Sequence, residues 1–373
     1  MSLGTTRNLR QALTILAAAA LLAGCAGDRA VAFVTGQESH PSVGGQAAPA
    51  PAAGKGHALV FWKMIKGNTL GVQFRATNFL APEFFSSPHS QLIRPTSVAA
   101  RSHYVYIYDS ADANLYRYDL KADRLKLIKD LHNYITHGGA EENLTRFSSF
   151  KATRTATFPR PRSTFNQASI YVMPNLNYFV ADTYGGRVFY FSADGSLLRT
   201  FGAKINLVHP VGVVVDQAQS RVLVGDGRND YILKFDFLGH LEGSMGARGN
   251  APGEFINMMA MTADNDSLYV AGRVGHRLQV LSHQGRFEKE LPGGAVRFPT
   301  AIAVDGKKRV YVSSYLDNTI RVFSSNGKLI DTVGGTGVTP GHFKRITGLW
   351  ADQNFLYVAD SLNGRVQIMR IVD

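Results

Sequence analysis

The chain has 373 residues, of which 45% are hydrophobic and 18% are charged. This composition supplies a large buried core and excludes an intrinsically disordered protein. Cys25 is the only cysteine, which excludes intrachain disulfides and cysteine-based metal or redox sites. The formal net charge of +12 favours anionic partners such as lipid headgroups, acidic glycans or acidic proteins. Alternatively, the charge is scattered over the surface and serves solubility alone.

The first 25 residues are typical of an export signal. Arg7 and Arg10 precede an apolar run of nine residues at 15–23, which is too short to cross a bilayer. The sequence LAGC at 22–25 resembles the bacterial lipobox, with the sole cysteine at the required position. The resemblance implies removal of residues 1–24 and lipidation of Cys25. Because Ala26 rather than aspartate follows, it also implies an outer membrane lipoprotein facing the periplasm or the cell surface.

Residues 25–56 are expected to form the lipidated cysteine and a flexible tether. The stretch 42–56 is rich in alanine, proline and glycine and has no apolar periodicity, which is typical of an extended spacer. The remaining residues, 57–373, are expected to form one folded domain. Nucleic acid is not an expected partner of a protein exported from the cytoplasm.

A 12-residue pattern recurs along the folded part of the chain. Its copies begin at Ile107, Val180, Val224, Val270, Val312 and Val358. Each copy reads as the end of one strand, a polar turn and a second strand with alternating apolar residues. A buried strand precedes most copies, and a hairpin glycine follows several of them, as at Gly327. A unit of four short strands with a period of 42–46 residues predicts blades packed around an axis.

These repeats resemble the NHL family. The residues that carry the resemblance are the inner-strand pattern at 299–305, the sequence VADSLNGRVQ from Val358, and a following Gly-Lys-Leu as at 327–329. The resemblance implies an all-β fold, a six-bladed β-propeller of four-stranded antiparallel blades. The last repeat ends before its outer strand, and we expect the apolar stretch 58–64 to supply that strand and close the ring. Alternatively, this stretch packs elsewhere and side chains alone close the ring.

The spacing between the first two copies is 73 residues, and the excess forms an insertion at 131–166. In a propeller it lies on the face that carries the turns inside the 12-residue copies and the connections between blades, which we call the top face. Basic and aromatic side chains alternate in it, a pattern suited to an anionic polymer or an acidic protein. The binding candidates are Arg146, Phe147, Phe150, Lys151, Arg154, Arg160 and Arg162. Alternatively, the phenylalanines hold the insertion on the propeller while the cations face water.

Three histidines on the top face are candidates for a metal site: His209, His276 and His342. Three histidines with an open coordination position can hold zinc, although solvated loop histidines are the alternative. Propellers similar to peptidyl-hydroxyglycine amidating lyase place their zinc histidines directly after the proline of the inner strand. Thr96, Val211 and Thr300 occupy those positions here, which argues against that activity.

Two sets of aspartates recur and are interpreted as structural. Asp182 and Asp360 lie five residues before Arg187 and Arg365, so the members of each pair could interact across the turn. The other set ends the inner strands and is expected to form Asx turns instead of a metal site. Its members are Asp216, Asp264, Asp305 and Asp352.

The sequence therefore predicts a lipid-anchored envelope propeller that acts as a protein- or ligand-binding scaffold through its top face and the 131–166 insertion. Its expected partners are the membrane, through the lipid, and an envelope protein or anionic glycan. No cofactor is expected. The alternative function is a metal-assisted lyase or hydrolase with its site at the mouth of the central channel.

Overall fold

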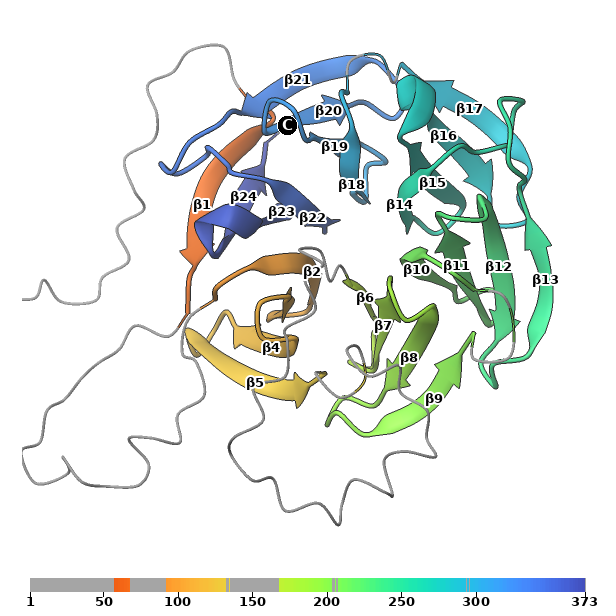
Figure 1. The fold of residues 1–373 in the computed structure, drawn as a ribbon. Helices are drawn as coiled ribbons and strands as arrows, with labels where there is room; N and C mark the ends of the chain where they lie inside the picture. Colours follow the sequence, from red (N-terminus) through yellow and green to blue (C-terminus); the bar gives the residue numbers. More distant parts are fainter. Residues whose placement is uncertain are drawn as a thin grey trace, which may run out of the picture. The chain divides into compact units, whose positions relative to one another are not determined.

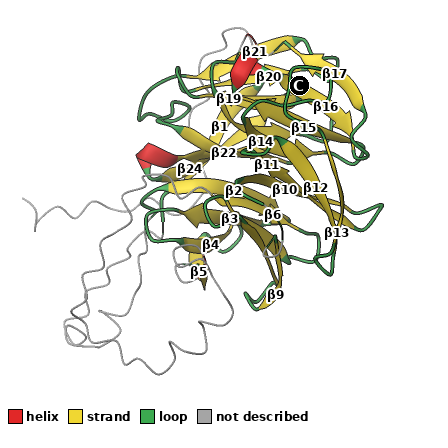
Figure 2. Cartoon of the chain, turned by 45° about the vertical axis from the view of Figure 1, so that its right-hand side comes forward, coloured by secondary structure: helices red, strands yellow, loops and turns green. Residues whose placement is uncertain are grey.

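In a computed structural model of the chain, residues 57–67, 92–131, 134, 168–202, 205, 207–292, 294 and 296–372 are described. The predicted signal peptide and tether at 1–56 lie outside these ranges. The described elements are 24 β-strands and two short 3-10 helices, η4 (Val274–His276) and η6 (Ser361–Asn363). Figure 2 shows how strongly strands dominate this part of the chain. Within it, no helix combines the length and apolar character needed to cross a membrane.

The strands form six separate sheets of four strands each, which are the blades of a propeller (Figure 1). Blade 1 comprises β2 (Pro95–Arg101), β3 (Tyr104–Asp109), β4 (Asn114–Asp119) and β5 (Arg124–Asp130). Blade 2 comprises β6 (Ala168–Val172), β7 (Tyr178–Asp182), β8 (Arg187–Phe191) and β9 (Leu197–Phe201). Blade 3 comprises β10 (Pro210–Asp216), β11 (Arg221–Asp226), β12 (Tyr231–Asp236) and β13 (Leu241–Met245). Blade 4 comprises β14 (Met258–Ala263), β15 (Ser267–Gly272), β16 (Leu278–Ser282) and β17 (Phe287–Leu291). Blade 5 comprises β18 (Pro299–Val304), β19 (Val310–Ser314), β20 (Thr319–Phe323) and β21 (Leu329–Gly334). Blade 6 comprises β22 (Ile346–Ala351), β23 (Phe355–Asp360), β24 (Arg365–Ile371) and β1 (Leu59–Ile65).

The order of strands in each blade follows their hydrophobic pattern. The first strand of each blade lies next to the axis and contacts the first strands of both neighbouring blades, which completes a ring. The second strand is buried on both faces, as in β11, where five of six residues are buried. The outermost strand alternates or faces water, as in β13, where one residue of five is buried. The all-β, six-bladed fold predicted from the sequence is confirmed.

The ring closes as predicted, because the N-terminal strand β1 pairs with β24 in the sheet order β1-β24-β23-β22. The register places Leu59 opposite Ile371 and Met64 opposite Gln367, with an irregularity between Phe61 and Lys63. Leu59 is 2% exposed, and just before it the Ala58 N–H donates to the Asp331 carboxylate of β21 at 2.7 Å. The first strand therefore covers the edge of β24 and contacts blade 5.

The degenerate copy at Ile107 forms a complete blade. Where other blades have a hairpin glycine, such as Gly327 with φ +89°, this blade has Ala122. The positive φ moves one residue along the chain to Asp123, at +52°. The Asp119 carboxylate accepts N–H groups of Lys121 and Ala122 and stabilises the longer turn. An aspartate in the left-handed region thus replaces the missing glycine.

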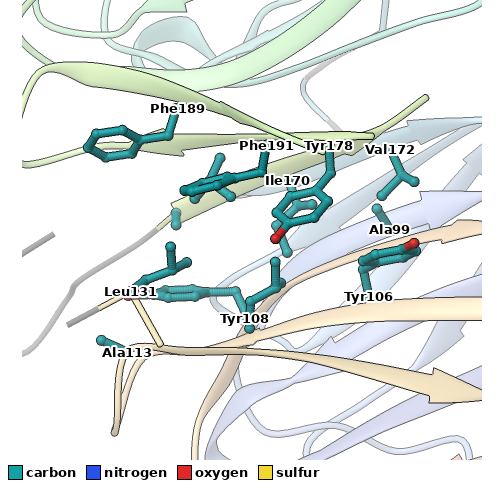
Figure 3. Close-up of a cluster of buried hydrophobic side chains, with 13 residues drawn as sticks. Ala99, Tyr106, Tyr108, Ala113, Leu131, Ile170, Val172, Tyr178, Phe189 and Phe191 are labelled. Carbon is teal, nitrogen blue, oxygen red and sulfur yellow. The ribbon is translucent and has the colours of Figure 1, made fainter. Parts of the chain in front are cut away.

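Aromatic side chains fill the space between blades 1 and 2 (Figure 3). Tyr106 and Tyr108 of blade 1 face Tyr178 and Phe191 of blade 2, and all four are fully buried. The rings of Tyr178 and Phe191 stack with centroids 5.3 Å apart, and the Tyr106 and Tyr178 centroids are 5.9 Å apart. Aromatic packing of this kind holds the wedge-shaped gap between adjacent sheets closed.

The aspartates that end the inner strands form Asx turns, as predicted. The Asp305 Oδ1 accepts the N–H groups of Lys307 and Arg309, each at 2.9 Å. The corresponding atom of Asp352 accepts two N–H groups at 2.8 Å. These carboxylates lie on the face opposite the top face, which we call the bottom face.

Candidate ligand-binding pocket on the top face

Most of the sequence-predicted site residues lie outside the described part of the chain. These are Cys25 and the insertion candidates Arg146, Phe147, Phe150, Lys151, Arg154, Arg160 and Arg162. The described ends of the insertion are Leu131, which follows β5, and Ala168, which begins β6. Strand direction puts both of these ends on the top face, as expected from the repeat order.

The described part of the top face contains a cavity of about 520 Å³ that the sequence analysis did not identify. Turns within blades contribute Tyr184, Arg273, Tyr315 and Leu316 to its wall, and connections between blades contribute His209, Phe298 and Arg345. Its floor consists of the second residues of three inner strands, Met259, Thr300 and Thr347. The floor residues also line the axial channel, so the cavity is the upper mouth of that channel.

Two arginines of this pocket lie over aromatic rings. The Arg273 Cζ is 5.2 Å from the centroid of Phe298, and the Arg345 Cζ is 5.5 Å from that of Tyr315. On the other side, the rings of Tyr184 and His209 meet edge to face with centroids 6.0 Å apart. Stacking restrains the two guanidinium groups, whose charge and planar N–H donors suit recognition of an anion.

Backbone hydrogen bonds hold the loops that carry these side chains. The buried Asp226 carboxylate accepts the N–H groups of Val208 at 2.8 Å and His209 at 3.2 Å. The Arg345 N–H donates to Asn318 Oδ1 at 2.7 Å, which ties the connection after β21 to blade 5. The Arg273 N–H donates to the Asn257 carbonyl at 2.9 Å. The pocket wall is therefore anchored to the rigid ends of the blades.

The recurring aspartates have a different role from the one that the sequence suggested. Asp226, Asp109 and Asp360 each accept N–H groups of the connection that precedes their own blade. Asp360 also forms the expected ion pair, with its Oδ2 2.6 Å from Arg365 Nε. Asp182 lacks a contact of this kind: within the described chain no hydrogen bond reaches its buried Oδ2, and Arg187 acts on it as a nearby charge that opposes the rise in its pKa caused by burial.

The pocket is electropositive. Among the described residues that line it there is no aspartate or glutamate, whereas Arg273 and Arg345 are permanently charged. Burial lowers the pKa of His209 below its usual value, an effect that the nearby Asp226 carboxylate opposes. The His209 imidazole is thus neutral at neutral pH and able to accept a proton or hydrogen bond.

Of the two metal candidates whose side chains are described, His209 lines the pocket and His342 does not. His342 lies in the connection between β21 and β22, where its Nδ1 is 3.1 Å from Thr339 Oγ1. The side chain of His276 lies outside the description. Across the described ranges, no group of three histidine, cysteine, aspartate or glutamate residues has the arrangement of a metal site. The histidine trio therefore stays a prediction.

No family model and no curated protein matches the sequence. Solved structures similar to the chain include a Bacteroides thetaiotaomicron protein of unknown function, at 10% identity and TM-score 0.54, covering 76% of this chain and 70% of that one. A streptogramin B lyase matches at 14% identity and TM-score 0.50, covering 75% of this chain and 94% of the lyase. A virginiamycin B lyase from Staphylococcus aureus matches at 13% identity and TM-score 0.49, covering 77% and 83%. At such identities the likeness establishes the propeller fold alone.

Proposed function

We propose that the chain is a lipid-anchored envelope propeller of the NHL type that binds an anionic ligand with an apolar or aromatic part in the top-face pocket. Lipidation of Cys25 would hold it at the outer membrane, and the tether at 25–56 would allow the propeller to reach its partner. An acidic side chain of an envelope protein or a carboxylate of an anionic glycan has the required charge.

The observation that carries this proposal is the composition of the pocket wall. Two arginines stacked on aromatic rings supply charge-assisted donors, while Phe298, Tyr315 and Leu316 supply apolar surface beside them. A ligand with a carboxylate next to an apolar group satisfies both parts, whereas a cationic ligand would be repelled. The described ends of the insertion, Leu131 and Ala168, lie on this same face, so the cationic insertion would extend the positive surface toward a larger partner.

A matched pair of fluorescent probes tests the proposal. Dansylglycine carries a carboxylate beside an aromatic group, and dansylamide carries the aromatic group without the charge. We expect the chain to bind dansylglycine more tightly, and replacing both pocket arginines, Arg273→Ala with Arg345→Ala, to weaken binding by about 10- to 100-fold. Arg286→Ala removes an exposed arginine from the bottom face and should change nothing.

Equal affinity for the two probes, or equal losses in the pocket and control variants, would contradict the proposal. Circular dichroism and the unfolding midpoint of each variant establish that the fold is intact. Because Arg273 and Arg345 lie on loops over rings that are only half-buried or exposed, their replacement should leave the propeller folded.

One observation favours a second function, a metal-assisted lyase or hydrolase. His209 is a neutral imidazole at the mouth of a channel, a group suited to act as a base or metal ligand. Metal analysis of the purified chain tests this candidate. Stoichiometric zinc or calcium that is lost in His209→Ala would favour the enzyme, and a metal content unaffected by that change would count against it.

A further inference from the structure

The lower mouth of the axial channel contains a second cavity, of about 690 Å³, on the bottom face. Its wall includes five aspartates: Asp216, Asp264, Asp266, Asp305 and Asp352. The cationic side chains that line it are Arg101 and Lys308, together with the ionisable His283. Carboxylates thus outnumber permanent cations here, the reverse of the top-face pocket, and this mouth attracts positively charged ligands.

His283 is the unusual group in this cavity. It is 9% exposed, and its Nδ1 lies 3.4 Å from Oδ2 of Asp216, a residue that is 3% exposed. Its Nε2 is buried and has no hydrogen-bond partner among the residues that the structure describes. A carboxylate facing Nδ1 favours the tautomer with the proton on that nitrogen, so Nε2 presents a lone pair. A buried acceptor left without a donor is destabilising, and a ligand that supplies a donor removes that penalty.

The other charged groups of the cavity are already engaged. Tyrosine hydroxyls donate to Asp264 at 2.8 Å, to Asp305 at 2.9 Å and to Asp352 at 3.0 Å. The Lys308 Nζ donates to Asp266 at 2.8 Å and lies 4.0 Å from Asp264. The Arg101 guanidinium donates to the Val172 carbonyl at 3.1 Å. These carboxylates supply a negative field, whereas Nε2 of His283 is an acceptor for which the described part of the chain provides no donor.

Aromatic surface lies where this cavity meets the channel. Tyr171 and Trp350 line both spaces, and their rings meet edge to face with centroids 5.8 Å apart. Aromatic rings of this kind accept an alkyl chain or the face of a cation. The mouth therefore offers an acceptor, a negative field and an apolar surface.

We propose that the bottom cavity binds a primary ammonium group on an alkyl chain, such as an alkylamine or a lysine side chain. An ammonium N–H donates to His283 Nε2, the aspartates stabilise the charge, and the alkyl chain packs on Tyr171 and Trp350. This site lies at the opposite mouth from the anion pocket, so either proposal can fail without the other.

Calorimetric titration with butylammonium chloride tests the site, with tetramethylammonium as a cation that lacks N–H donors. We expect the chain to bind butylammonium at least about tenfold more tightly than tetramethylammonium. His283→Phe should weaken butylammonium binding by a similar factor. The control is His240→Phe, because His240 also faces an aspartate on the bottom face but is 74% exposed and outside the cavity.

A measurement without substitution guards against misfolding of the His283 variant. In the ¹⁵N-labelled chain, butylammonium should shift the Nε2 resonance of His283 and leave those of His240 in place. Absence of binding, equal affinity for both ammonium ions, or an unperturbed His283 resonance would overturn the proposal. Zinc binding that displaces butylammonium would identify a metal site instead and would also overturn it.

Discussion

Replacing Arg365 should destabilise the propeller because its guanidinium joins the last blade to the connection before it. Its side chain is 4% exposed, and its Nε lies 2.6 Å from the fully buried Asp360 carboxylate. Its Nη1 donates to the Val338 carbonyl at 2.6 Å and its Nη2 to the His342 carbonyl at 2.8 Å. Arg365→Met keeps the aliphatic volume but leaves the carboxylate without its cation.

The size of the effect follows from the partners that remain. Removing one member of a buried ion pair costs about 3–5 kcal/mol. Asp360 keeps the Lys344 N–H at 2.7 Å and the Asn363 amide at 2.8 Å, which places the loss near the lower end, at about 3 kcal/mol. Guanidinium chloride unfolding, followed by tryptophan fluorescence and circular dichroism, measures this change.

A matched control occupies the same repeat position in blade 2. Arg187 makes no ion pair with Asp182 in the described structure, so Arg187→Met should cost less than about 1 kcal/mol. Adding Asp360→Asn to Arg365→Met should recover part of the stability, because no buried charge is then left unpaired. Equal losses for the two arginine variants would refute the reasoning.

Three further results are expected. Burial raises the pKa of Asp182 to about 6, above its unfolded value, so its stabilising contribution is present in acid and is lost as the pH rises through 6. The free energy of unfolding of Asp182→Asn, measured by denaturant titration, should therefore rise by about 2–3 kcal/mol relative to the parent between pH 4 and 8. A difference that stays constant over this range would contradict the assignment. Leu59→Ala in the closing strand should lower the free energy of unfolding by about 2–5 kcal/mol. The control Leu241→Ala, also in an outer strand but 45% exposed, should lower it by less than about 1 kcal/mol. Similar losses of stability in the two variants would argue against closure by β1. Cys25→Ser should move the chain from the membrane to the soluble fraction on ultracentrifugation, and continued sedimentation with membranes would contradict lipid anchoring.

The fold was predictable because each blade repeats the same local information. Alternating residues, turn signals and a regular period specify four strands per unit, and the missing outer strand after Val358 indicated that 58–64 would complete the ring. Even the degenerate first copy fits, since Asp123 adopts the left-handed conformation that glycine adopts elsewhere.

The top-face pocket was harder to predict because it is assembled from single residues of different blades. His209, Phe298 and Arg345 each directly precede an inner strand, so they occupy one repeat position and the ring brings them around one mouth. Within any one repeat, none of them stands out from an ordinary loop residue. Comparing that position across the repeats would have supplied the signal.

For the aspartate–arginine pairs, the five-residue spacing suggested more ion pairs than the described structure contains. The same spacing gives an ion pair at Asp360, whereas at Asp182 no hydrogen bond within the described chain reaches the buried Oδ2. Blades 4 and 5 carry Gly272 and Ser314 in place of the aspartate. At Asp360 the arginine is also held by carbonyl groups of the preceding connection, a set of contacts that sequence spacing does not encode.

A crystal structure of the chain with dansylglycine tests the account most directly. We predict that the carboxylate lies within hydrogen-bond distance of the Arg273 or Arg345 guanidinium, with the aromatic group against Phe298 or Tyr315. A probe bound away from these residues, or bound there with its carboxylate in solvent, would contradict the claim that the upper mouth of this propeller is built for an anion.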